Sequence, residues 1–246
     1  MVMSSREYFS KQFQSLNPSR VSSKRISAIS NLSFDLRELA PALAIEAMNN
    51  PHLSDQGKRA ARYKALKELF VENARSRNEL KRIRDTAQAE MDALALPTLD
   101  KGDIVSEMRE AEMRAIVRAM PQEQRDHLSK MSPTMAAAIV RAPPELSGVS
   151  RSVHAQIRGE LIETAHPEKV AALRAELEGL SHADLIVKDT DKALTESAAF
   201  LPGEDRAFLA EVESSLDKPK PAVEDGPNDL DAIIAAHRRR RRIPAA

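Results

Sequence analysis

Apolar residues recur every three to four positions over most of this chain, a spacing that places them on one face of a helix. The longest such stretch begins near Ser54, and no proline interrupts it before Pro97. Its apolar positions include Leu66, Phe70 and Leu80. The pattern therefore predicts one helix of about forty residues, well above the usual length in globular proteins.

Polar residues interrupt the apolar stripe of this long helix at Asn73, Arg77 and Arg84. An interrupted stripe favours a helical hairpin or a helix that faces a partner over a regular coiled coil. We therefore expect residues 31–97 to form a long helical hairpin region. The 54–95 helix is also a candidate surface for homo-oligomerisation. Pro41, upstream of it, predicts a kink or a division into two short helices.

Beyond Pro97 the predicted helices are shorter, and a motif recurs. Residues 116–121 read IVRAMP, residues 139–144 read IVRAPP, and residues 162–167 read IETAHP, with a period of 23 in both steps. Each copy can end one helix while its proline begins the next, because the first turn of a helix does not need the missing N–H. We expect residues 98–217 to form a bundle of short antiparallel helices. The 23-residue spacing is either a true repeat or a coincidence in a chain rich in Ala and Arg.

Three further boundary signals lie in the second half of the chain. Ser147 or Ser150 can cap a helix at its N-terminus. Gly179 predicts the end of a helix, and Ser181 can cap the helix that follows. The run Asp189-Thr190-Asp191, flanked by lysines, is interpreted as an exposed helix face.

Both ends of the chain differ in composition from the rest. Residues 1–30 are serine-rich and basic, and we expect them to form a flexible N-terminal arm. From Leu201 to Asp231 the chain carries nine acidic and three basic residues. Residues 218–246 are expected to form an acidic, proline-rich linker that leads into an arginine-rich tail.

Composition supports a helical fold. Only eight aromatic residues occur, tryptophan is absent, and the apolar residues are mostly Leu, Ile, Val, Met and Ala. Helices favour such residues, whereas sheets favour β-branched and aromatic ones. The predicted fold is all-α: a multi-helix bundle with one long central helix, several short antiparallel helices and flexible basic termini.

The arginine run changes the electrostatic picture. The chain holds 37 basic and 37 acidic residues, so removal of five arginines would leave 32 against 37, a net charge of −5. Five adjacent guanidiniums are too costly to bury without partners, so they must face water or an anionic partner. The candidate binding residues are Arg238, Arg239, Arg240, Arg241 and Arg242, with secondary basic contacts at Arg20, Lys24, Arg25, Arg59 and Arg62.

The sequence offers little material for catalysis. It has no cysteine, its six histidines are scattered, and it has no Gly-x-Ser-x-Gly motif or phosphate-binding loop. We expect no enzyme activity, no cofactor and no metal. No apolar run reaches the length of a membrane span, so we expect no membrane partner and a cytoplasmic location.

These observations favour a non-catalytic helical interaction or adaptor protein whose tail binds an anionic partner. Nucleic acid is the first choice, through phosphate contacts without base readout, because no aromatic residues lie among the arginines. An acidic protein surface is the second choice, and a solubilising or address-type tail with no fixed partner is the third. The acidic stretch before the tail could mask the arginines.

In outline, the short basic C-terminal helix resembles bacteriophage scaffolding proteins, and the arginine-rich C-terminus resembles the export signals of type IV secretion substrates. These resemblances imply, as alternatives, a structural assembly factor or a secreted effector.

Overall fold

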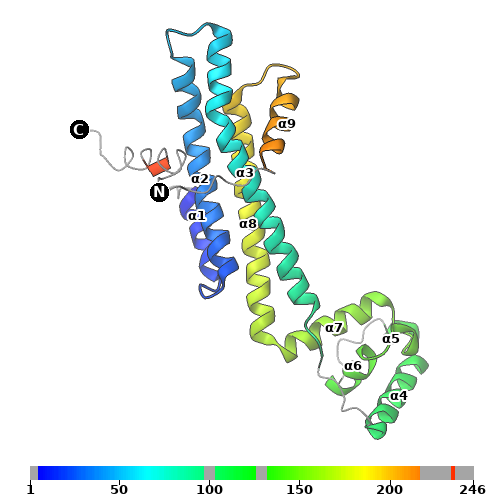
Figure 1. The fold of residues 1–246 in the computed structure, drawn as a ribbon. Coiled ribbons are helices and arrows are strands. Elements are labelled where there is room, and N and C mark those ends of the chain that lie inside the picture. Colours follow the sequence, from blue (N-terminus) through cyan, green and yellow to red (C-terminus); the bar gives the residue numbers. More distant parts are fainter. Residues whose placement is uncertain (1–4, 97–102, 126–131, 217–233, 236–246) are drawn as a thin grey trace. The chain divides into compact units, whose positions relative to one another are not determined.

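The computed structural model describes residues 5–96, 103–125, 132–216 and 234–235 (Figure 1). These residues contain helices and turns but no strand, so the predicted all-α fold is confirmed. The chain forms two compact units, which divide it differently from the four expected segments. The first comprises residues 1–87 and 175–246, and the second comprises residues 88–174.

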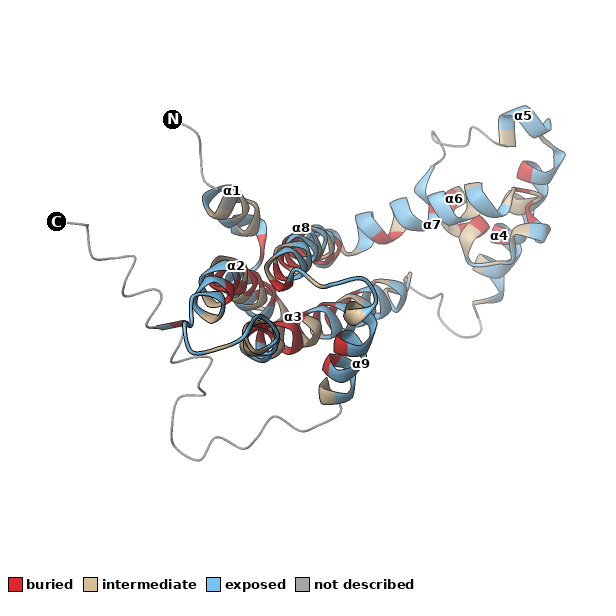
Figure 2. Ribbon diagram, turned by 90° about the horizontal axis from the view of Figure 1, so that it is seen from above, coloured by how far each residue is buried: buried red, intermediate tan, exposed pale blue. Residues whose placement is uncertain are grey.

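Three long helices form the frame of the first unit. They are α2 (Val21–Met48), α3 (Asp55–Asp92) and α8 (Pro167–Ala198), and Figure 1 shows them side by side. The view along their axes in Figure 2 shows the buried sides of these helices turned toward one another. The expected long helix is α3, with 38 residues. The shorter elements are α1 (Ser5–Gln12), the 3-10 turn η1 (Phe13–Ser15) and α9 (Glu204–Leu216).

Aliphatic side chains from all three long helices fill the core of this unit. One cluster centres on Leu36, Leu66 and Leu194, each fully buried. A second cluster of buried residues includes Ile26 and Leu80, which are both fully buried. Four of the eight aromatic residues gather at the edge of the first cluster, with ring centroids 5.1–6.2 Å apart: Tyr63, Phe70, Phe200 and Phe208. Such spacing is typical of packed aromatic pairs.

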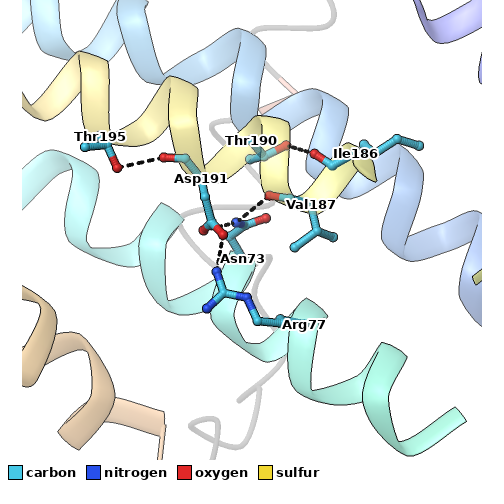
Figure 3. A network of polar contacts seen from close by, with 7 residues as sticks. All are labelled: Asn73, Arg77, Ile186, Val187, Thr190, Asp191 and Thr195. Carbon is cyan, nitrogen blue, oxygen red and sulfur yellow. Dashed lines mark hydrogen bonds and ion pairs between the residues drawn. The ribbon is translucent and has the colours of Figure 1, made fainter. Parts of the chain in front are cut away.

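A buried polar network joins α3 to α8 (Figure 3). The Asn73 side chain is fully buried, and its Nδ2 donates to the Val187 carbonyl at 3.2 Å and to Asp191 Oδ1 at 2.6 Å. Arg77 binds the other carboxylate oxygen of Asp191. Thr190, fully buried one residue away, donates to carbonyls of Ser33 and Ile186. The polar residues that interrupt the apolar stripe of α3 therefore form contacts between helices.

Two expectations about α8 were wrong. Gly179 does not end a helix, because α8 continues through it to Ala198. A β-carbon at Gly179 would lie 2.7 Å from Cδ2 of Leu16, so the absent side chain admits Leu16 to the helix surface. The run Asp189-Thr190-Asp191 is not an exposed face, since Thr190 is buried and Asp191 binds Asn73.

Pro41 lies inside α2 without ending it, so the predicted division into two short helices was wrong. Residues 5–30, expected as a flexible arm, are mostly helical and contact the bundle. Arg6 binds the buried carboxylate of Asp35 at 3.1 Å, and the Phe9 ring lies 6.1 Å from the Phe34 ring. The ring of Phe9 thus gives this segment an aromatic contact with α2.

The second unit contains short helices, as expected. They are α4 (Ile104–Ala119), α5 (Gln122–Arg125), α6 (Pro133–Val140), η2 (Pro144–Leu146) and α7 (Arg151–Ala165). The three copies of the repeated motif lie at the ends of α4, α6 and α7, and a helical element begins at or just after each following proline. Ser150 caps α7 through the Val153 amide, as predicted for this serine. Because these helices differ in length, the three copies have in common only the signal that ends one helix and begins the next element.

The core of the second unit is small and relies on one buried carboxylate. Val117, Ile139 and Ile157 form its apolar centre. Glu110 of α4 is 7% exposed, forms an ion pair with Arg141 and lies 3.7 Å from Arg114. Because a buried charge without partners is costly, these arginines fix α4 to the end of α6.

Two glycines inside helices test the role assigned to Gly179. Alanine is favoured over glycine in a helix interior by about 1 kcal/mol. Gly159→Ala in α7 should therefore raise the free energy of unfolding, since no atom lies within 4 Å of the added methyl group. Gly179→Ala should lower it, because the methyl group would displace the buried Leu16. Urea unfolding measures both variants, and a stabilising Gly179→Ala would contradict the packing role.

Candidate anionic-partner interface

The five arginines of the candidate site, Arg238–Arg242, lie outside the described residues. The chain is described again at residues 234–235, coloured red in Figure 1, where a helical segment lies beside α2. Ile234 is 6% exposed and belongs to the core cluster that contains Leu36 and Leu39 of α2. The arginine run is therefore preceded by an apolar anchor in the first unit.

The anchor limits how far the arginines can lie from the bundle. A fully extended chain spans at most about 3.6 Å per residue, so Arg238 lies within about 14 Å of Ile234, and Arg242 within about 28 Å. Burial of an isoleucine side chain stabilises by about 1.5–3 kcal/mol, which favours the attached state. The chain is thus fixed at Ile234, four residues before the arginine run begins.

Three of the secondary basic residues lie near the start of α2. Arg20 Nε lies 2.7 Å from Glu176 Oε2, and that carboxylate is 2% exposed. Arg25 forms an ion pair with Glu79 at 2.9 Å, while Lys24 is exposed. Arg20 and Arg25 therefore connect α2 to α8 and α3, and Lys24 extends into solvent.

The other two secondary residues lie on the first turns of α3. Arg59 is half-buried, whereas Arg62 is buried and 9% exposed. The Arg62 guanidinium donates to the Ala199 carbonyl at 3.1 Å and lies 5.6 Å from the Tyr63 ring centroid. Ala199 follows the end of α8 with a φ of 46°, which only glycine adopts without strain. Arg62 thus binds the carbonyl end of α8.

The remaining cations of α3 are largely paired within the fold. Lys67 binds Glu211 of α9, Arg77 binds Asp191, and Arg84 binds Asp184, the last two both on α8. Arg75 pairs with Glu72 on its own helix at 2.5 Å. Four of the ten basic residues of α3 thus bind groups outside this helix: Arg62, Lys67, Arg77 and Arg84.

The acidic stretch after Leu201 begins as a packed helix. The Tyr63 hydroxyl donates to Glu204 Oε2 at 2.5 Å, and the Leu201 amide donates to the same oxygen at 3.2 Å. These bonds, that of Tyr63 first, lower the pKa of Glu204, while burial and the Glu204 contact raise the pKa of Tyr63. Glu204 and Glu211 thus bind Tyr63 and Lys67 of α3. The expected masking of the arginines by the acidic stretch falls largely on residues 217–231, which lie outside the described residues.

Within the described ranges, no three His, Asp or Glu side chains lie close enough together to hold a metal ion. None of the helices in these ranges combines the length and the apolar composition that crossing a membrane requires. Comparison of the chain with protein-family models, curated proteins and solved structures found no match. Its function must therefore be inferred from its own residues and contacts.

Arg59 and Arg62 give a matched pair for the structural role of Arg62. Arg62→Met keeps the aliphatic stem but removes the charged bond to the Ala199 carbonyl, and it should lower the free energy of unfolding by about 1.5–3 kcal/mol. Arg59→Met should change it by less than about 0.5 kcal/mol, because Arg59 is half-buried at the surface. Urea unfolding provides both values, and equal effects would contradict the assignment.

The lowered pKa of Glu204 predicts a dependence of stability on pH. A carboxylate whose pKa falls on folding stabilises the fold above its unfolded pKa, about 4.3, and this contribution disappears as the pH falls through the folded pKa. Glu204→Gln should therefore destabilise at neutral pH and approach wild-type stability in acid. Glu213→Gln, an exposed change on the same helix, is the control. A difference between wild type and Glu204→Gln that persists at pH 2 would contradict the prediction.

Proposed function

We propose that this protein is a non-catalytic helical adaptor whose arginine run, held near the bundle by Ile234, binds nucleic acid through its phosphates. Two features support the proposal. The run concentrates five charges in five residues, and its anchor is buried in the core of the first unit. The burial of Ile234 is the observation on which the proposal depends. A run of arginines attached next to a buried residue can add its charge to the surface of the folded protein.

The internal pairing of other cations strengthens this choice of site. Arg20, Arg25, Arg77 and Arg84 each bind a carboxylate on another helix. Use of these residues on an external anion would require breaking contacts that hold the bundle together. The five adjacent guanidiniums of the arginine run are too densely charged to be buried together, so we assign them an external anion as partner.

An assembly factor is the second candidate function. It is favoured by the exposed apolar side of α4, where Ile104, Val105 and Met108 are each more than 60% exposed. Self-association through residues 54–95 remains a hypothesis. The apolar residues of α3 that would make such a contact, including Leu66, Leu69 and Leu80, are buried in the chain's own core.

Binding to mixed-sequence DNA and RNA, measured by fluorescence anisotropy across a salt series, tests the proposal. Release of counterions from five phosphates gives a slope of log K against log salt of about −4.5 for duplex DNA and about −3.5 for single strands. Replacement of Arg238–Arg242 by alanine should abolish this binding at physiological salt.

A second variant separates the arginine run from net charge. Five exposed cations of the helices can be replaced by alanine, which gives the same net charge of −5 as the tail variant: Lys64, Lys81, Lys169, Lys188 and Arg206. This control should retain nearly all of the affinity and the salt dependence. Equal losses in the two variants would replace the proposed site by a general charge effect, and no binding by wild type at low salt would exclude nucleic acid.

A further inference from the structure

Helix α4 turns its apolar side to solvent. Its exposed large residues are Ile104 at 66%, Val105 at 68%, Met108 at 63% and Ile116 at 53%. The residues it buries are Val117 and the charged Glu110. This is the reverse of the usual arrangement for a surface helix, which buries its apolar stripe.

The exposed apolar residues form one continuous face. At 100° per residue, they lie within an arc of about 140° around α4, and Glu112 is the only charged residue in that arc. The members of this outer face are Ile104, Val105, Met108, Ala111, Glu112, Ala115, Ile116 and Ala119, all exposed. Four of them, Ile104, Met108, Ala111 and Ala115, follow the 4-3-4 spacing of a helix that packs along another helix.

The sizes of these residues complement a second copy of the same helix in antiparallel orientation. In an antiparallel pair, residue numbers rise along one helix as they fall along the other, so the numbers of two opposing residues have a constant sum. With a sum of 223, Ile104 faces Ala119 and Met108 faces Ala115. Large side chains therefore meet small ones at both ends of the contact, by two-fold symmetry. With a sum of 221, Val105 faces Ile116 along one edge.

The charges that border the outer face follow the same register. In an antiparallel pair, equivalent edges of the two helices face each other. Glu107 and Arg118 share one edge, with a sum of 225, so each Glu107 meets the Arg118 of the other copy. Arg109 borders the opposite edge, and with a sum of 221 it meets Glu112, the charged member of the face, of the other copy. All four side chains are exposed.

A parallel arrangement of the two helices lacks this complementarity. Positions on opposite edges then face each other about five residues apart, as g and e positions do in a parallel coiled coil. Glu107 of one copy would lie near Glu112 of the other, which places like charges together. In the antiparallel arrangement the two Glu112 side chains also approach each other, since their numbers sum to 224, but each then has Arg109 of the other copy beside it. The charges of α4 therefore favour the antiparallel orientation.

We propose that α4 is the contact between two copies of this chain, which pair antiparallel through the outer face of α4. The occupant is a second copy because both the sizes and the charges along the helix are self-complementary. The 16-residue helix is about 24 Å long. The pairing is therefore a reversible one that depends on protein concentration. The contact uses residues of α4 alone, so it does not require the arginine run or a ligand bound to it.

Charge reversals test the register without disturbing the core of the unit. Glu107→Arg and Arg118→Glu, made singly, each replace two attractive pairs by two repulsive ones and should weaken dimerisation roughly 5- to 30-fold. The double variant restores both attractive pairs and should recover most of the wild-type affinity. Sedimentation velocity on the nuclease-treated full chain, over about a hundredfold range of concentration, measures the dimer dissociation constant.

Two further variants complete the test. Met108→Glu adds a second acidic residue to the outer face, one turn from Glu112, and should abolish the dimer, with an unchanged circular dichroism spectrum. Arg206→Glu, an exposed reversal on α9, should leave dimerisation unchanged. A wild-type chain that stays monomeric, single reversals without effect, or a double variant that remains as weak as the single ones would each overturn the proposal. Full dimerisation by Met108→Glu would also overturn it.

Discussion

The bundle of the first unit depends on the requirement that the buried N–H groups of the Asn73 side chain find acceptors. Asn73 is fully buried in the middle of α3, where loss of its partners would cost about 1–3 kcal/mol. Its partners are the Val187 carbonyl and the Asp191 carboxylate of α8. Leucines could slide past one another at small cost, but these directional bonds fix which turn of α3 meets which turn of α8. The pairs Arg77–Asp191 and Arg84–Asp184 extend the same alignment along the two helices.

The sequence was sufficient for the fold class and for the length of α3, because apolar periodicity and the absence of proline are local signals. It was misleading at Gly179, where glycine serves packing, and at Asn73, where a polar residue in an apolar stripe serves pairing. Both roles depend on residues more than a hundred positions away, Leu16 and Asp191. Periodicity within one helix contains no information about such partners. Glu204 and Glu211 were likewise assigned to an acidic stretch, although α9 uses them to bind Tyr63 and Lys67.

For the candidate site, the sequence could group basic residues by charge but could not assign the contacts that each one makes. Arg20, Arg25 and Arg62 were grouped with Lys24 and Arg59 by charge alone. The structure separates them, since the first three bind Glu176, Glu79 and the Ala199 carbonyl. A guanidinium offers several donors in a fixed geometry, so it joins helices as readily as it binds phosphate. The signal that distinguishes the arginine run is density, because five adjacent guanidiniums are too costly to bury together without partners.

The two proposed contacts differ in the physical term that drives them. Binding by the arginine run is electrostatic, so it weakens as salt rises and tolerates many anionic partners. Pairing through α4 depends on apolar burial and on register, so it selects its own copy and survives salt better. An adaptor needs both properties: a general affinity for an extended anion and a specific contact that doubles the number of runs applied to it. Two linked runs on one polyanion bind with a higher effective concentration than one, so dimerisation through α4 would strengthen nucleic-acid binding without any new contact to the phosphates.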